Sequence, residues 1–232
     1  MHRPAVRPAL GVLAIAGAGL LTIGAASAVE WPTALGPVVL SERCVVAGSG
    51  VAYTPQEVRA AWGAPPPELA PAVSGTQQAS LSCTVRPAEA PRQSEGADGL
   101  TDRSRTVRDA ATAAFGPLPT GGYQPGGVTS GHIPGSAHYD GRAVDLFFRP
   151  VGDPGQNAKG WAVAHWLVAH ASTYSVATVI YDDRIWTASR STEGWRPYSH
   201  PSGDHGNDVL QHRDHVHVDV VRGSAGAISG ER

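Results

Sequence analysis

The stretch Gly135–Phe148 reads GSAHYDGRAVDLFF and joins a turn to a strand. Gly141 favours the turn, and the residues after it, Arg142–Phe148, have the apolar composition of a strand. Side chains on a strand alternate between its two faces, so Asp145 is predicted to share a face with Ala and Phe side chains. A carboxylate buried in such surroundings costs several kcal/mol unless it is paired or binds a metal. His138, on the turn, could reach over the same face.

A second strand near the carboxyl end repeats this combination. The stretch His212–Val220 reads HRDHVHVDV, and a strand is predicted over Asp214–Val221. Alternation separates an apolar face from a polar face. The apolar face consists of Val216, Val218 and Val220, and the polar face consists of His215, His217 and Asp219. Two imidazoles that are two residues apart therefore point into the same space.

Two histidines and one aspartate match the ligand types of a catalytic zinc ion, which keeps a fourth position open for water. Such an ion lowers the pKa of its water to about 7, and a nearby base can then make that water a nucleophile. The spacing alone also fits ordinary strand packing or weak adventitious metal binding, because HxH by itself is a weak signal.

The first residues have the features of an export signal. Residues 1–28 contain Arg3 and Arg7, continue in a Gly- and Ala-rich apolar run, and end in Ala26–Ala28, which has the small-x-small pattern of a signal-peptidase site. We expect cleavage there and a secreted or cell-envelope, extracytoplasmic protein. The alternative is an uncleaved segment that anchors the chain in the membrane.

Charge excludes one class of partner. The formal net charge is −2, and it becomes −4 without residues 1–28, which carry two arginines and no acid. No basic patch of the kind that binds nucleic acid is present in the sequence, so no nucleic-acid partner is expected. The remaining length suits one core with an extension. We expect a monomer that contacts a membrane only through an uncleaved N-terminal segment.

The two cysteines, Cys44 and Cys83, are predicted to form a disulfide in an exported protein. The bond would close a loop of about 40 residues, which the chain-entropy model values at roughly 4 kcal/mol. Neither cysteine is near the histidine and aspartate clusters, and no CxxC is present. Thiolate ligands are therefore not expected at the metal site.

Composition divides the chain into four parts. Residues 1–28 form the signal or anchor, and residues 29–98 form a Pro- and Ala-rich segment with the predicted disulfide. Residues 99–222 form the domain that contains both clusters, and residues 223–232 are predicted to be a flexible tail. The N-terminal segment carries no chemistry that its residues identify.

Two helix starts are indicated by capping residues. In TPQEVRAAWG, Thr54 and Glu57 form a capping box, and Gly63 is predicted to end the helix. A second helix begins at Thr101 or Asp102. Its predicted apolar face consists of Val107, Ala111, Ala114 and Phe115.

The rest of the domain alternates strands with one apolar helix. The predicted elements are strand 142–148, helix 158–172, strand 176–181, a turn at Asp182-Asp183, the strand RIWTA and strand 214–221. One helix precedes the strands and one interrupts them. The predicted fold class is therefore α+β, with a mainly antiparallel sheet, flanking helices and the zinc site on the sheet face.

The other candidate residues have weaker signals. The loop PLPTGGYQPGGVTSGHIPGS is too long for a simple connector and suggests a binding loop. Four loop histidines are expected to be exposed: His132, His200, His205 and His212. Two helix histidines are expected at the helix surface or as satisfied core residues: His165 and His170. Three aromatic residues are expected either in a substrate groove or in the core: Trp186, Trp195 and Tyr198.

Residues 136–145, SAHYDGRAVD, match all five defined positions of the motif S-x-H-x-x-G-x-A-x-D. This motif is typical of a zinc peptidase superfamily that includes D-Ala-D-Ala carboxypeptidases, lysostaphin-type endopeptidases and the hedgehog signalling domain. The later sequence DHVH resembles the second motif of this superfamily, which is E-x-x-H or H-x-H. The resemblance covers roughly Leu100–Val221 and is closest to the D-Ala-D-Ala carboxypeptidase-like domains secreted by actinobacteria.

The resemblance implies that His138, Asp145 and His217 bind zinc. Asp214 stands three residues before the last ligand, where the carboxypeptidases carry a glutamate base. His215 stands at the first position of H-x-H, where the endopeptidases carry a histidine that acts in the reaction. The spacing favours Asp214 as the base, with His215 steadying the oxyanion or the water. The alternative assigns the proton to His215 and leaves Asp214 to orient it.

Two further positions are expected on the substrate side, Ser136 and Gln124. Ser136, with Gly141, shapes the turn around the first ligand. Carboxypeptidase relatives often carry G-Y-R upstream, and its arginine binds substrate or the developing oxyanion. Here GGYQPGG places Gln124 at that position, and a glutamine donates a hydrogen bond without a charge. The departure weakens the preference for a free C-terminal carboxylate and leaves an endopeptidase open.

The sequence therefore predicts an exported zinc metallopeptidase that hydrolyses amide bonds in peptidoglycan stem peptides or crosslinks. The rival hypothesis is a non-hydrolytic, zinc-containing cell-wall-binding or interaction module, because a fold can keep its metal site without keeping the reaction.

Overall fold

The computed structural model describes residues 42–47, 51–85 and 90–224, which belong to one compact unit of the chain. The predicted signal segment lies outside these residues, and so does most of the predicted C-terminal tail. The helices are α1 (Pro55–Ala60), α2 (Ala70–Ser74), α3 (Asp102–Phe115), α4 (Pro154–Ala169) and α5 (Ala171–Tyr174). The strands are β1 (Cys44–Val46), β2 (Ala52–Tyr53), β3 (Leu81–Cys83), β4 (Thr120–Gly121), β5 (Ala143–Phe147), β6 (Val176–Tyr181), β7 (Arg184–Thr187), β8 (Arg196–Pro197) and β9 (His215–Val220). Short 3-10 helices lie at Gln77–Ala79, Ala137–Asp140 and Ala188–Glu193.

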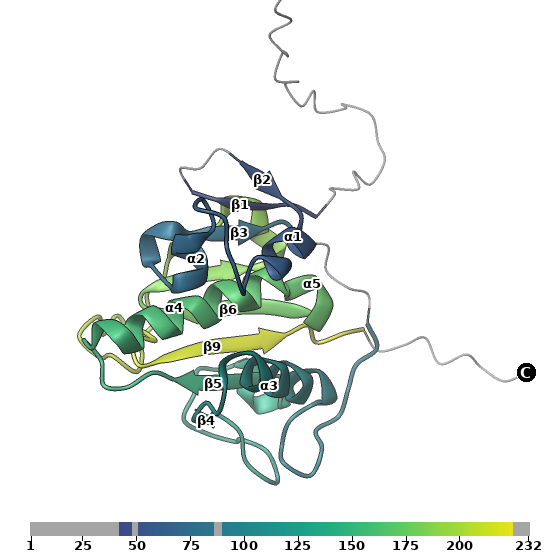
Figure 1. The fold of residues 1–232 in the computed structure, drawn as a ribbon. Coiled ribbons are helices and arrows are strands. Elements are labelled where there is room, and N and C mark those ends of the chain that lie inside the picture. The colour runs from purple at the N-terminus through teal and green to yellow at the C-terminus, as the bar shows by residue number, and fades with distance from the viewer. Residues whose placement is uncertain (1–41, 48–50, 86–89, 225–232) are drawn as a thin grey trace, which may run out of the picture. The chain divides into compact units, whose positions relative to one another are not determined.

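A six-stranded sheet forms the centre of the fold. Its strand order is β4-β5-β9-β6-β7-β8, and each neighbouring pair is antiparallel. Helices α3 and α4 pack against this sheet (Figure 1). The predicted α+β class with an antiparallel sheet is confirmed.

The alternation predicted for the two motif strands is also observed. On the helix-facing side, Val144 and Leu146 of β5 lie beside the valines of β9. These side chains are at most 1% exposed, and each stabilises the fold by about 1.5–3 kcal/mol through burial. The opposite face is thereby left for the polar side chains. Packing of one face thus decides where the candidate ligands point.

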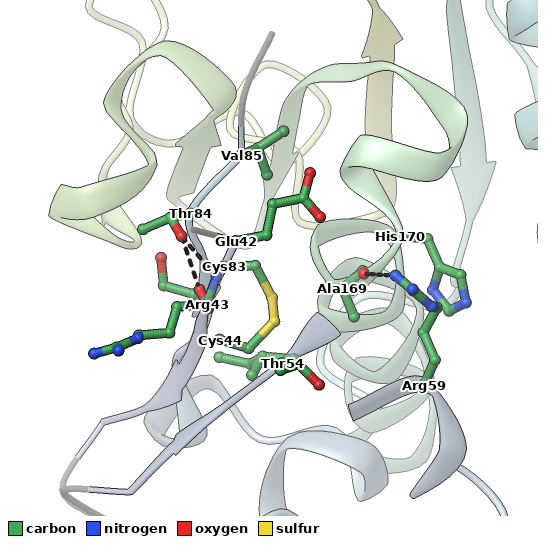
Figure 2. The surroundings of a disulfide bond; sticks show 12 residues. Glu42, Arg43, Cys44, Thr54, Arg59, Cys83, Thr84, Val85, Ala169 and His170 are labelled. Carbon is green, nitrogen blue, oxygen red and sulfur yellow. Dashed lines mark hydrogen bonds between the residues drawn. A yellow bond between two sulfur atoms is a disulfide. The ribbon is translucent and has the colours of Figure 1, made fainter. Parts of the chain in front are cut away.

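Three N-terminal strands form a separate sheet in the order β2-β1-β3. The disulfide Cys44–Cys83 joins residues that are directly paired across β1 and β3, so the predicted pairing is confirmed (Figure 2). This layer packs on α4 through α2 and β3. Arg59 of α1 donates to the Ala169 carbonyl at 3.1 Å (Figure 2). At the end of α2, a Cβ on Gly75 would lie 1.7 Å from the Ala158 carbonyl oxygen. Residue 75 must therefore be glycine for its backbone to pack this closely on α4.

The disulfide is consistent with an extracytoplasmic location, since such bonds persist in oxidising compartments. Among the described residues, none of the helices is both long and apolar enough to cross a bilayer.

Helix boundaries follow the capping residues with small differences. The capping box of Thr54 and Glu57 is present, although α1 ends three residues before the predicted Gly63. Thr101, one of the two candidates, caps α3. Helix α4 begins four residues earlier than predicted because Asp153 caps it through the Gln156 amide.

The predicted apolar face of α3 is wrong in one position. Val107 and Ala111 are fully buried and Phe115 is half-buried, but Ala114 is exposed. The helix turns Ala114 away from the sheet because only a narrow stripe of α3 contacts the core. At its start, Ser104 donates to the Gly141 carbonyl at 2.7 Å, which ties α3 to the motif turn.

Candidate metal centre

Two strands and one turn bring three ligand side chains together. Asp145 and His217 are direct partners across the β5–β9 ladder. His138 lies on the 3-10 helix Ala137–Asp140, and the hydroxyl of the capping residue Ser136 accepts from the His138 amide at 3.4 Å. We call His138, Asp145 and His217 the ligand triad; each is at most 7% exposed.

The donor atoms of the ligand triad form a nearly equilateral triangle. Its sides are 3.1 Å from His138 Nε2 to His217 Nδ1, 3.2 Å from His217 Nδ1 to Asp145 Oδ1, and 3.4 Å from His138 Nε2 to Asp145 Oδ1. Tetrahedral zinc with bonds of about 2.0–2.1 Å separates its ligand atoms by about 3.3 Å. These three residues therefore could hold one metal ion.

The outward-facing nitrogens of both imidazoles also have partners. His138 Nδ1 lies 2.6 Å from the Gly122 carbonyl, which can only accept, so Nδ1 carries the hydrogen and Nε2 is free to bind a metal. His217 Nε2 faces Asp219 at 3.6 Å. Such outer partners orient metal-binding imidazoles. Neither Gly122 nor Asp219 was recognised from the sequence as a partner of a ligand.

The backbone conformation and the surroundings of Gly122 both require glycine at this position. Its φ is +77°, and a Cβ there would lie 2.3 Å from His138 Cε1 and 2.7 Å from Asp145 Oδ2. The backbone of residue 122 thus packs directly on two ligands. A side chain at this position would push the ligand triad apart.

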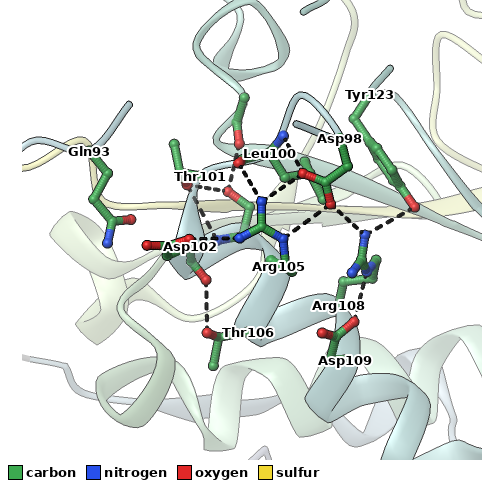
Figure 3. A network of polar contacts seen from close by, with 12 residues as sticks. Gln93, Asp98, Leu100, Thr101, Asp102, Arg105, Thr106, Arg108, Asp109 and Tyr123 are labelled. Atoms are coloured by element: carbon green, nitrogen blue, oxygen red, sulfur yellow. Dashed lines mark hydrogen bonds and ion pairs between the residues drawn. The ribbon is translucent and has the colours of Figure 1, made fainter. Parts of the chain in front are cut away.

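A polar network holds the segment that supplies Gly122 (Figure 3). Asp98 accepts from Arg105 at 2.7 Å and from Arg108 at 3.2 Å. The hydrogen bond from Arg105 outweighs burial and holds the pKa of Asp98 well below its usual range. Arg108 also donates to the Tyr123 hydroxyl at 3.5 Å and lies 5.6 Å from the centre of its ring. Because Tyr123 adjoins Gly122, the network fixes the carbonyl that orients the first ligand.

The electrostatics of the triad favour a positive charge between its three donor atoms. Burial opposes ionisation of Asp145, but the adjacent imidazoles of His138 and His217, the latter hydrogen-bonded to Asp145, outweigh it and hold the pKa of Asp145 well below its usual range. Burial likewise opposes the charge on His217, while Asp145 and Asp219 outweigh it and raise the pKa of His217 to about 9. A metal ion that binds here has to displace that proton, so metal affinity decreases as the pH falls.

Beside the triad lies a hydrogen-bonded pair, which we call the dyad: His215 and Asp214. His215 Nδ1 donates to Asp214 Oδ1 at 2.6 Å, and His215 Nε2 faces Asp145 Oδ1 at 3.6 Å. Arg149 donates to Asp214 Oδ2 from Nε at 2.9 Å and from Nη2 at 2.6 Å. The guanidinium also stacks over the Phe147 ring at 4.2 Å. Arg149 was not identified from the sequence, because it lies 65 residues from its partner.

The two residues of the dyad differ in what they can do. Burial opposes ionisation of Asp214, but hydrogen bonds from His215 and Arg149 outweigh it and lower the pKa of Asp214. Both of its oxygens are engaged. In a neutral His215 ring whose Nδ1 donates to Asp214, Nε2 carries no hydrogen and its lone pair faces the triad.

The triad and His215 line a groove with a volume of about 530 Å³. The loop that contains residues 131–137 lines one part of it, and residues 198–212 contribute another. The groove is lined by Gly131, His132, Ile133, Pro134, Gly135, Ser136, Ala137, His138, Asp145, Ile180, Tyr198, His200, Val209, Leu210, His212, His215, His217 and Asp219. The long loop predicted to bind a ligand thus does contribute to the groove.

Three histidines predicted to be exposed instead line the groove: His132, His200 and His212. His132 is half-buried and stacks on His138 with 4.0 Å between ring centres. Burial holds the pKa of His212 far below its usual value, and its ring lies 4.7 Å from that of His215. The prediction is wrong for His132 and His212 because each ring packs on an imidazole of the site, His138 or His215. His205 is exposed as predicted, and His200 is partly exposed.

The two expected substrate-side residues occupy different positions. Ser136 lines the groove and caps the turn of His138. Gln124 is exposed, its amide donates to the Gly127 carbonyl at 3.0 Å, and it does not line the groove. Among the three candidate aromatics, Tyr198 lines the groove, whereas Trp186 is fully buried in the core.

The helix histidines are part of the packing between α4 and its surroundings. His165 is fully buried and donates from Nδ1 to the Ala72 carbonyl at 3.0 Å. His170 bonds to the Trp166 carbonyl at 2.8 Å and stacks on Tyr174. Both are remote from the groove lining.

Comparison with known proteins gives one family match. The family described as VldE, C-terminal domain, matches residues 96–209, just under half of the chain. The matched region includes His138 and Asp145 but ends before the strand that carries His217. No curated protein and no solved structure matches the chain significantly. The match is a likeness in sequence and assigns no reaction to this chain.

Proposed function

We propose that the protein is an extracytoplasmic zinc peptidase that hydrolyses amide bonds in peptidoglycan stem peptides or crosslinks. The observation that carries this proposal is the buried triangle of ligand atoms beside an oriented imidazole in the lining of a groove. A purely structural zinc site usually has four protein ligands, whereas this triad has three and adjoins open space.

The donor set supports zinc. Two imidazole nitrogens and one carboxylate oxygen suit this borderline ion, and the same set in catalytic sites keeps a position for water or substrate. When bound, the ion would polarise the scissile carbonyl and lower the pKa of a water molecule. His138, Asp145 and His217 would hold it, with Gly122 and Asp219 fixing the two rings.

The proton transfer is assigned to His215. Its Nε2 faces the triad, and Asp214 holds its Nδ1 hydrogen at 2.6 Å. His215 would accept a proton from the nucleophilic water and return it to the leaving amine. Asp214 would orient the ring and stabilise its charged form, and Arg149 would keep Asp214 ionised. This assignment reverses the preference that the three-residue spacing indicated.

The choice of substrate rests on the motif resemblance of residues 136–145 and 214–217. Peptide amides in the cell wall also agree with an extracytoplasmic location, which the disulfide is consistent with. The rival function, a non-hydrolytic wall-binding module, is favoured by one observation. Gln124 does not line the groove and its amide is bonded to the Gly127 carbonyl, so the position where carboxypeptidase relatives carry an arginine would contribute little to oxyanion stabilisation.

The two functions can be separated in one experiment. The chain without residues 1–28, loaded with zinc, is incubated with purified peptidoglycan, and new free amines are measured. The peptidase should release amines, and the variant His215→Gln, with equal zinc content, should release far fewer. Zinc-loaded wild-type protein that sediments with the wall but releases no amines would establish the binding module instead.

A further inference from the structure

The charged groups of the groove set the kind of peptide that it can bind. Among the described residues that line it, none is arginine or lysine, and the two acids are Asp145 and Asp219. Asp145 belongs to the ligand triad. Asp219 lines the groove on the other side of His217 from the dyad, because it lies two residues further along the same face of β9. A free carboxylate placed there would meet a like charge.

Three arginines that flank the motif segments are bonded elsewhere. Each pairs with an aspartate and lines no part of the groove; the pairs are Arg142–Asp140 at 3.2 Å, Arg149–Asp214 at 2.6 Å and Arg213–Asp183 at 2.8 Å. A carboxylate-specific site holds its ligand with an arginine or lysine, often through a bidentate contact. The described groove residues provide no such contact.

The rims of the groove are apolar. Ile133 on one loop is 41% exposed, and Val209 on the other is 53% exposed. Leu210, Pro134 and Tyr198 add further apolar surface. Six imidazoles line the groove. His138 and His217 face the metal position, and His215 is bonded to Asp214. His200 is bonded to the Ser202 hydroxyl, His212 to the Leu210 carbonyl, and His132 stacks on His138. Such walls suit an uncharged stretch of peptide with small apolar side chains.

We infer that the groove binds an internal, uncharged segment of a peptide, so that the protein acts as an endopeptidase and not as a carboxypeptidase. This inference rests on the proposed peptidase function and specifies its substrate. Amide bonds that have further residues, or a neutral group, on their C-terminal side would be preferred. Peptides that end in a free carboxylate directly after the scissile bond would be poor substrates.

A matched pair of substrates tests the inference. Two synthetic stem-type pentapeptides end in D-Ala-D-Ala and differ only in a free or an amidated C-terminus. kcat/KM for each is measured on the zinc-loaded protein, with products identified by mass spectrometry. We expect the amidated peptide to be cleaved at least as well as the free acid. A preference of about tenfold or more for the free acid, the scale of one charge-assisted hydrogen bond, would overturn the inference.

A binding measurement keeps the test decisive if neither peptide is cleaved. Calorimetry then gives Kd for the same pair on the zinc-loaded protein. Equal affinity, or tighter binding of the amide, supports a groove that does not select carboxylates. Binding of the free acid that is tenfold tighter or more contradicts it. Absence of cleavage, by contrast, counts against the proposed hydrolysis alone.

Discussion

Asp214 accepts the Nδ1 hydrogen of His215 at 2.6 Å while its second oxygen is held by Arg149. A carboxylate in this position has no free oxygen with which to take a proton from water. Under the proposed function, this geometry assigns Asp214 to orient the ring and His215 to act as the base. The spacing of the motif that the sequence resembles suggested the opposite roles, and the difference leads to the first prediction.

Replacing His215 should damage turnover more than replacing Asp214. His215→Gln removes the proton acceptor, so turnover should fall by about 10²–10⁴ with zinc retained. Asp214→Asn keeps the side-chain shape and should cause a much smaller loss. Turnover of the two variants is compared at equal zinc content. A greater loss in Asp214→Asn would restore Asp214 as the base.

Each member of the ligand triad should be required for metal. His138→Ala, Asp145→Ala and His217→Ala should each abolish stoichiometric zinc, because two ligands hold the ion too weakly. The fold should persist, since the valine face of β9 is untouched. Metal analysis and far-UV circular dichroism measure the two outcomes, with the exposed His205→Ala as a control. Full zinc in all three variants would refute the ligand assignment.

Gly122→Ala should weaken metal binding without a change in any ligand. The new Cβ would lie 2.3 Å from His138 Cε1, so the ring and its carbonyl partner must separate. Loss of such an outer partner typically lowers metal affinity by about 10–100-fold. Gly126→Ala is a matched control, since Gly126 also has a positive φ, of +82°, but no atom lies within 4 Å of its Cβ. Equal losses in both variants would point to backbone strain alone.

The Cys44–Cys83 bond should be present in exported protein and should stabilise it. Non-reducing mass spectrometry is expected to find both thiols blocked. The double variant Cys44→Ser, Cys83→Ser should lose about 2–5 kcal/mol in the free energy of unfolding, measured with urea. Two free thiols in protein collected outside the cytoplasm would contradict both the bond and the argument for location.

The fully buried His165 should make the fold sensitive to acid. Burial lowers the pKa of His165 to about 4 in the folded chain, whereas its unfolded pKa is about 6.5. The unfolded state therefore binds more protons between these values, and stability is highest above pH ~6.5 and falls as the pH drops towards 4. The group's share is on the order of 3 kcal/mol.

Urea unfolding at several pH values measures this effect. His165→Asn cannot titrate but can still donate to the Ala72 carbonyl, so its stability should fall less steeply with acid than that of the wild type. A lower stability of the variant at pH 7 is expected from the lost packing and does not affect the comparison of slopes. Identical slopes in wild type and variant would show that His165 is not responsible.

The local features of this chain could be predicted because neighbouring residues determine them. Alternation on β5 and β9 follows from the two-residue period of a strand, so the grouping of His215, His217 and Asp219 on one face of β9 required no knowledge of the fold. The pairing that brings Asp145 opposite His217 comes from the β5–β9 register. Helix starts at Thr54 and Thr101 follow from side chains that bond to amides three residues away. The oxidation state of the two cysteines follows from the compartment that an export signal implies.

Only tertiary structure decided which distant residues complete the site. Arg149 reaches Asp214 across 65 residues, and the Gly122 carbonyl meets His138 across 16, so no local pattern marks either pair. His212 lies just before the strand β9, but its burial also depends on Tyr198, whose ring packs against it at 5.0 Å between ring centres. Sequence periodicity reports which way a side chain points relative to its own strand. The groups that it meets there depend on the packing of other segments, which periodicity does not encode.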